Sequence, residues 1–121
     1  MVGMVCLLPL SLVAQDPLVG DWKTMIPGDQ GQMVPMKVSI KADGTYALDF
    51  GMDGTVDING AYQRNGDDMT IWDVSGQTDC DKKGVYKVAI ASDGKSYSMT
   101  RVSDECQGRG GPEGKMSFQR L

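Results

Sequence analysis

The sequence contains no histidine. This absence removes the side chain that most often acts as a general base, ligates haem iron or completes a zinc site. We also find no paired nucleophile and base and no glycine-rich phosphate loop in the sequence. We therefore expect a protein that is not an enzyme and that has no metal and no cofactor.

Positive charge and long apolar runs are also scarce. Twelve Lys and Arg residues stand against 16 Asp and Glu, so the formal net charge is -4. A net negative chain is poorly suited to nucleic acid or to anionic membrane surfaces. The longest apolar segment, near the N-terminus, is too short to span a bilayer as a helix. We expect no nucleic-acid partner and no membrane span.

That first segment, MVGMVCLLPLSLVAQ at residues 1–15, ends in a small residue before Asp16 and predicts a secretory signal peptide. Its start lacks the usual Lys or Arg. Cys6 is a poor lipoprotein attachment site, because Val5 precedes it where such sites carry Gly, Ala or Ser. Residues 16–121 are then expected to form one secreted or periplasmic domain, which is long enough for a single core.

Only two of the three cysteines, Cys80 and Cys106, lie after this segment. An even number in an oxidising compartment predicts one disulfide. A redox or metal role is disfavoured, because the chain has no Cys-x-x-Cys motif and no histidine.

The apolar residues after Gln15 follow a period of two, and no window of ten residues has a helical stripe. This pattern predicts an all-β domain with little or no helix. In the fourth strand we expect Val56, Ile58, Gly60 and Tyr62 to share one face. The expected strands are residues 18–26, 36–42, 45–50, 56–62, 69–74, 86–90, 97–101 and 115–120.

Three connections carry the two-residue signal of a tight hairpin, at residues 43–44, 65–66 and 93–94. The others, at residues 27–35, 51–54, 75–83 and 103–114, are mostly longer and rich in Gly, Asp and Pro. In an antiparallel meander alternate loops fall at opposite ends, so one end is expected to be closed and the other to form a mouth. Eight such strands can avoid exposed edges by closing into an antiparallel up-and-down barrel.

Both ends of this domain resemble the lipocalins and related calycins. LVGDW at residues 18–22 looks like the Gly-x-Trp signature of their first strand, and SFQRL places Arg120 where the family has an Arg across that Trp. The resemblance implies that Trp22 and Arg120 form a structural latch at the closed end. A guanidinium stacked on an indole contributes roughly 1 kcal/mol.

The later stretch resembles small secreted bacterial lipocalin-like proteins, in which a cysteine before the sixth strand and a D-x-C-x-x-R motif recur. The matching residues are Cys80, Asp104, Cys106 and Arg109. The chain is about 50 residues shorter than typical larger lipocalins, and no C-terminal helix follows the last strand. A roomy ligand cavity therefore does not follow from the resemblance.

Methionine is abundant near the expected mouth. Met25, Met33, Met36, Met52 and Met116 all map there or to its approach. These thioethers could fill the core, form an adaptable apolar ligand mouth or, if several converge, bind Cu(I).

Charged residues in the expected loops admit several interpretations. The carboxylates that flank the cysteines are typical of solvated loops, and calcium binding is an alternative. Neither this group nor Asp49, Asp53 and Asp57 has the D-x-D-x-D-G spacing. Strand alternation places Arg101 on the same face as Tyr97 and Met99. If that face is internal, Arg101 needs an anionic partner, either Asp73 or a ligand carboxylate; otherwise it lies at the rim. The flanking carboxylates are Asp79, Asp81, Asp104 and Glu105.

We expect a monomeric, non-enzymatic binding barrel that holds a small apolar or amphipathic ligand at its loop-rich end. The alternative is a protein-binding module, such as a hydrolase inhibitor, with a barrel filled by its own side chains. Known inhibitors of that size use an N-terminal extension, and Asp16-Pro17 offers no counterpart. The expected ligand-binding residues are Met25, Met36, Tyr46, Phe50, Met52, Tyr86, Met99, Arg101, Met116 and Phe118.

Overall fold

Eight β-strands follow one another in a computed structural model that describes residues 16–77, 80–106 and 108–121. The predicted signal peptide, Cys6 and Asp79 lie outside these residues. No helix in the described part of the chain has the length and apolarity needed to cross a bilayer. The strands are β1 (Gly20–Pro27), β2 (Met33–Ile40), β3 (Thr45–Phe50), β4 (Ile58–Asn65), β5 (Asp68–Gly76), β6 (Gly84–Ile90), β7 (Ser96–Asp104) and β8 (Lys115–Arg120).

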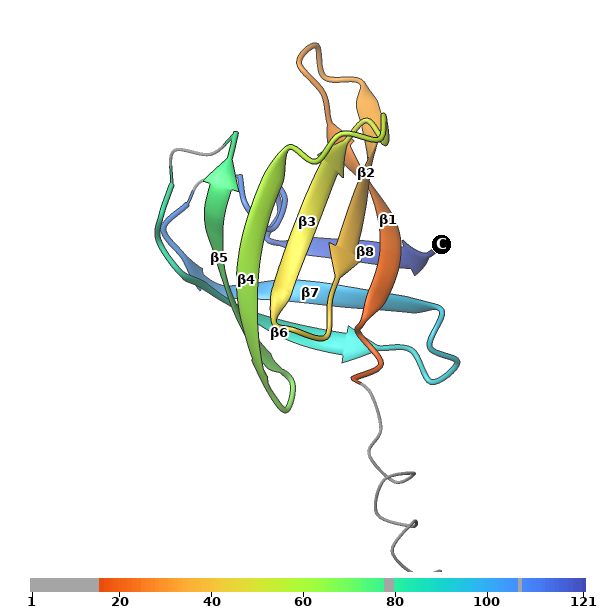
Figure 1. Ribbon diagram of the computed structural model, residues 1–121, viewed down its shortest axis with the longest axis vertical. Helices are drawn as coiled ribbons and strands as arrows, with labels where there is room; N and C mark the ends of the chain where they lie inside the picture. The colour runs from red at the N-terminus through yellow and green to blue at the C-terminus, as the bar shows by residue number, and fades with distance from the viewer. Residues whose placement is uncertain (1–15, 78–79, 107) are drawn as a thin grey trace, which may run out of the picture.

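Each strand pairs antiparallel with the next, and the first and last strands also pair, so the sheet closes into a barrel (Figure 1). Trp22 of β1 lies opposite Arg120 of β8 in this closing pair. The prediction of an all-β, eight-stranded antiparallel up-and-down barrel is confirmed.

Strand alternation sorts the side chains between the core and the solvent. In β6, for example, Tyr86 and Val88 are buried while Lys87 and Ala89 are exposed. The same period of two brings one apolar face of every strand to the barrel interior. The largest fully buried side chains are Trp22, Tyr86, Phe118 and Leu18.

The three tight hairpins, which join β2 to β3, β4 to β5 and β6 to β7, lie at one end of the barrel. Two of them are held by an aspartate side chain that accepts a backbone N–H two residues further on, Asp43 from Thr45 and Asp93 from Lys95. These local bonds explain why the short turn signals in the sequence marked the closed end correctly.

The predicted latch between Trp22 and Arg120 is present. The guanidinium carbon lies 4.1 Å from the centre of the indole ring, and the guanidinium donates to the carbonyl oxygens of Pro17, Val19 and Gly94. Gly20 permits this approach, because a Cβ atom there would lie 2.4 Å from Nη1 of Arg120. The latch thus ties the chain before β1 to the turn between β6 and β7.

Several strand boundaries differ from the prediction by one to three residues, and two at the open end change the assignment of a named residue. β4 begins at Ile58, and Val56, which we expected to face inward, lies before the strand and is 50% exposed. β2 begins at Met33 and runs through Pro35, which we expected to end the preceding loop. The three residues of this strand before Met36 pair only with β1 and not with β3, and proline is tolerated at such an edge.

Candidate ligand-binding site

The barrel contains a cavity of about 580 Å³ near its open end. This volume lies within the range of about 300–1,000 Å³ that is typical of small-molecule sites. Residues from β1 to β5, β7 and β8 line it, together with the loops that follow β5 and β7. The lumen of this small barrel is therefore not filled by its own side chains.

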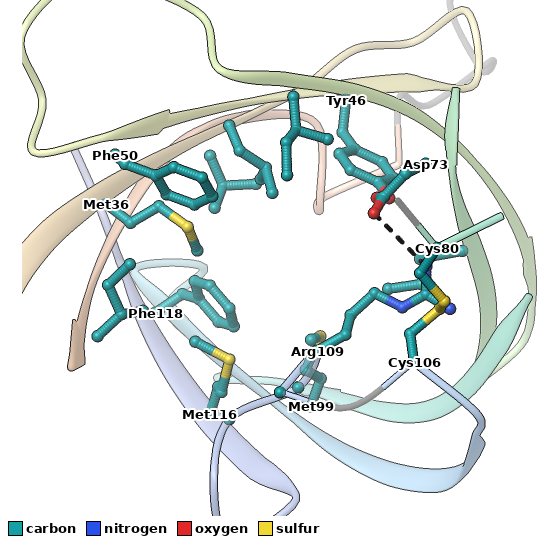
Figure 2. Close-up of a pocket in the computed structure, with 18 of the residues that line it drawn as sticks. Met36, Tyr46, Phe50, Asp73, Cys80, Met99, Cys106, Arg109, Met116 and Phe118 are labelled. Carbon is teal, nitrogen blue, oxygen red and sulfur yellow. Dashed lines mark hydrogen bonds and ion pairs between the residues drawn. A yellow bond between two sulfur atoms is a disulfide. The ribbon is translucent and has the colours of Figure 1, made fainter. Parts of the chain in front are cut away.

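One side of the cavity is apolar. Figure 2 shows Met36 and Phe50 on this side, with Phe118 and Met116 beside them. Below them Tyr97 stacks on Phe118 at a centroid distance of 4.4 Å and meets Trp22 edge to face at 4.6 Å. These aromatic contacts close the bottom of the lumen and leave flexible thioethers higher in the wall.

The opposite side carries hydrogen-bonding groups, among them Tyr46, Asp73 and Arg109 (Figure 2). The hydroxyl of Tyr46 donates to Oδ1 of Asp73 at 2.8 Å, and Nη1 of Arg109 lies 3.8 Å from Oδ2 of the same carboxylate. Burial, followed by the hydrogen bond and charge of Asp73, raises the pKa of Tyr46 above its usual value. Tyr46 therefore remains a neutral donor at physiological pH.

Arg109 is fixed in place by a second carboxylate, that of Asp104. Nε and Nη2 donate to its two oxygens at 2.7 and 2.8 Å, and Nη2 also donates to the carbonyl oxygen of Lys82 at 2.6 Å. Burial alone would raise the pKa of Asp104, but hydrogen bonds from Arg109, Tyr86 and the N–H of Cys106 outweigh burial and hold it below its usual value. The pair is ionised, and it anchors the guanidinium at the cavity wall.

The loop that follows β7 folds over the inward face of that strand. Arg101, for which we expected Asp73, a ligand carboxylate or a rim position, donates to the carbonyl oxygens of Arg109 and Gly111 at 2.7 and 3.0 Å. Gly110, at a φ of 86°, lies so close to the Tyr86 ring that a Cβ atom would come within 2.5 Å of it. Arg101 thus supports the loop, and Arg109 is the arginine that lines the cavity.

The predicted disulfide between Cys80 and Cys106 is present, with a Cα–Cα distance of 5.9 Å. It joins the loops that follow β5 and β7, and both cysteines line the cavity. The backbone N–H of Cys106 donates to Asp104. The crosslink therefore also stabilises the loop that presents Arg109.

The predicted ligand-binding residues divide into two groups. Met25 is 45% exposed on the outer surface, and Met52 lies in the β3–β4 loop at a φ of 53°. Tyr86 is fully buried, but its hydroxyl binds Asp104, and burial followed by this hydrogen bond raises its pKa to about 12. These three and Arg101 do not line the cavity. The six that do are Met36, Tyr46, Phe50, Met99, Met116 and Phe118.

Several cavity residues were missed. The strand alternation in the sequence already pointed to the aliphatic ones, but we gave weight to methionine and the aromatics. In the sequence, Asp73 is only a possible partner of Arg101, and Arg109 is only a residue of the D-x-C-x-x-R motif. The missed aliphatic side chains include Ile26, Val38, Ile40, Leu48, Ile58 and Ile71.

The structure also brings together Asp49, Asp53 and Asp57, whose spacing had argued against a calcium loop. One carboxylate oxygen from each lies within 4.8 Å of the others. Asp49 accepts the N–H groups of Asp53 and Gly54, and Asp57 accepts that of Phe50. These bonds hold the β3–β4 loop in place, which accounts for the cluster as a structural feature.

The site therefore combines a wide apolar surface with a small group of fixed polar side chains on one wall. Such an arrangement can bind a molecule and orient it. Comparison of the chain with protein-family models, with curated proteins and with solved structures gives no match.

Proposed function

We propose that this protein is a secreted or periplasmic, non-enzymatic binding protein that holds a small apolar or amphipathic molecule in a lipocalin-like barrel. The observation that carries the proposal is the cavity of about 580 Å³ inside the barrel. An eight-stranded barrel can be packed solid by its own side chains, and such a barrel would have no room for a ligand. Here that room exists.

The chemistry of the lining supports an apolar guest. Removing apolar surface from water contributes about 25 cal/mol per Å², so a hydrocarbon body gains free energy on entering such a cavity. Met36, Met99 and Met116 add flexible and polarizable thioethers, which adapt to guests of irregular shape.

The proposed location rests on the disulfide and on the sequence of residues 1–15. Disulfides persist in oxidising compartments such as the bacterial periplasm and the cell exterior. The Cys80–Cys106 bond is compatible with such a compartment, and the apolar N-terminal segment predicts export to it.

A neutral apolar dye, N-phenyl-1-naphthylamine, tests the proposal. We expect its fluorescence to rise on binding to the purified protein. Met99→Trp, which places an indole in the lumen, should weaken dye binding by about tenfold or more. The matched control is Thr100→Trp, because Thr100 is the exposed neighbour on the same strand and its indole would point outward.

Equal dye binding by both variants would show that the dye does not enter the lumen and would overturn the proposal. So would a folded wild-type protein that gives no fluorescence response. In that case the loops, acting on a protein partner, would be the better candidate for the functional surface.

A further inference from the structure

The polar wall, which is the side of the cavity formed by Tyr46, Asp73 and Arg109, contains a buried donor that has no acceptor among the described residues. The guanidinium of Arg109 has five N–H donors. Asp104 and the carbonyl oxygen of Lys82 take three of them, whereas Nη1 is buried and makes no hydrogen bond with any residue that the structure describes. A buried donor left unsatisfied costs about 1–3 kcal/mol, so an acceptor brought to this nitrogen would stabilise the complex.

Oδ2 of Asp73 lies 3.8 Å from this nitrogen. That distance is too long for a direct hydrogen bond, but it is less than twice the length of one, which is about 2.8 Å. A single oxygen atom can therefore accept from Nη1 and donate to Oδ2 at the same time. Arg109 and Asp73 both line the cavity, with side chains 12% and 9% exposed, so a small separation of the two side chains would bring them within reach of an oxygen atom in the lumen.

Three charged side chains surround the space between Nη1 of Arg109 and Oδ2 of Asp73: one guanidinium and two carboxylates. Arg109 is already paired with Asp104 through two hydrogen bonds, and Asp73 lies on its other side. Arg101, the second arginine near this loop, donates to backbone carbonyl oxygens and does not line the cavity. A carboxylate entering this space would meet the negative charge of Asp73, and an ammonium group has no lone pair with which to accept the hydrogen bond of Nη1.

We propose that the ligand carries an uncharged hydroxyl head group, which accepts a hydrogen bond from Arg109 and donates one to Asp73. This inference rests on the proposed function and names its ligand class: long-chain alcohols and similar neutral amphiphiles, in preference to fatty acids or amines. The Tyr46 hydroxyl holds Asp73 in position for this contact. The apolar side of the cavity, with Met36, Phe50 and Phe118, faces the polar wall and receives the hydrocarbon body (Figure 2).

Four ligands with the same twelve-carbon chain test the head group by displacement of N-phenyl-1-naphthylamine at pH 7, below the concentrations at which they aggregate. They are dodecanol, methyl dodecyl ether, dodecanoate and dodecylammonium. The ether accepts a hydrogen bond but cannot donate one. We expect dodecanol to bind about tenfold more tightly than each of the other three, which is the discrimination that one hydrogen bond to a charged group supplies.

Asp73→Asn removes the negative charge and leaves the pairing between Arg109 and Asp104 in place. With that repulsion gone, dodecanoate gains access to Nη1, and we expect the preference for dodecanol over dodecanoate to fall by about tenfold or to reverse. Asp67→Asn is the charge-matched control. Asp67 is exposed in the tight β4–β5 turn at the closed end, so the preference should not change.

The outcomes separate this inference from the proposed function. If the dye binds but wild-type protein takes up dodecanoate or the ether as tightly as dodecanol, the hydroxyl inference is wrong and the binding function stands. The inference is equally overturned if Asp73→Asn leaves the preference unchanged. If neither the dye nor any of the four ligands binds, the proposed function falls, and this inference falls with it.

Discussion

The disulfide provides the clearest quantitative prediction for stability. Cys80 and Cys106 are separated by 26 residues, and the loop-entropy relation for a crosslink of that length gives about 3.5 kcal/mol of stabilisation. The double variant Cys80→Ala/Cys106→Ala should therefore lose about 3.5 kcal/mol of unfolding free energy. For a domain of this size that loss corresponds to a melting temperature lower by roughly 15–25 °C.

Urea unfolding of residues 16–121, followed by circular dichroism, measures this difference. Reduction of the wild-type protein should lower its stability by the same amount, and the reductant should have no effect on the double variant. A loss below about 1 kcal/mol in the double variant would show that the disulfide does not constrain the unfolded chain to this extent.

The other predictions concern the latch and the ion pair behind the cavity. Arg120→Met should lower the unfolding free energy by about 1–2 kcal/mol, because it removes the stacking on Trp22 and the bonds to backbone carbonyls. In urea unfolding, the stability of Arg120→Lys should lie between that of Arg120→Met and that of wild type. If neither variant loses stability, the latch does not stabilise the fold. Asp104→Asn should cost about 3 kcal/mol at pH 7, because it leaves Arg109 buried without its carboxylate. The pKa of Asp104 is lower in the folded state, so its contribution to stability is complete above about pH 5 and is lost as the pH falls through the folded-state pKa. The variant should therefore lose less stability than wild type between about pH 5 and pH 2, and an unchanged acid dependence would contradict this assignment.

The sequence predicted the strands and turns well, because both depend on local patterns. β3 and β8 have the predicted bounds, and the three tight hairpins lie at the predicted residues. Boundary errors of one to three residues fall at both ends of the barrel, and at the open end they include the run of β2 through Pro35. Pro35 resembles a loop residue in sequence, but it sits in a part of β2 that has only one partner strand, and this pairing is a tertiary property.

The polar wall could be predicted only in part. Strand alternation correctly predicted that Arg101 faces the interior, but it could not show that the loop after β7 would cover that side chain. The loop path depends on glycines with positive φ, such as Gly108 and Gly110, and on the disulfide at Cys106. Arg109 reaches the cavity through this path, so its role was not evident from a strand pattern.

Methionine methyl groups report directly on whether apolar ligands enter the lumen of the barrel. Protein labelled with ¹³C at the methionine methyls would be titrated with dodecanol and followed by NMR. We expect the resonances of the cavity methionines to shift and those of the outer methionines to stay in place. The cavity set is Met36, Met69, Met99 and Met116, and the outer set is Met25, Met33 and Met52. Shifts confined to the outer set, or no shifts at all, would show that the ligand does not enter the lumen.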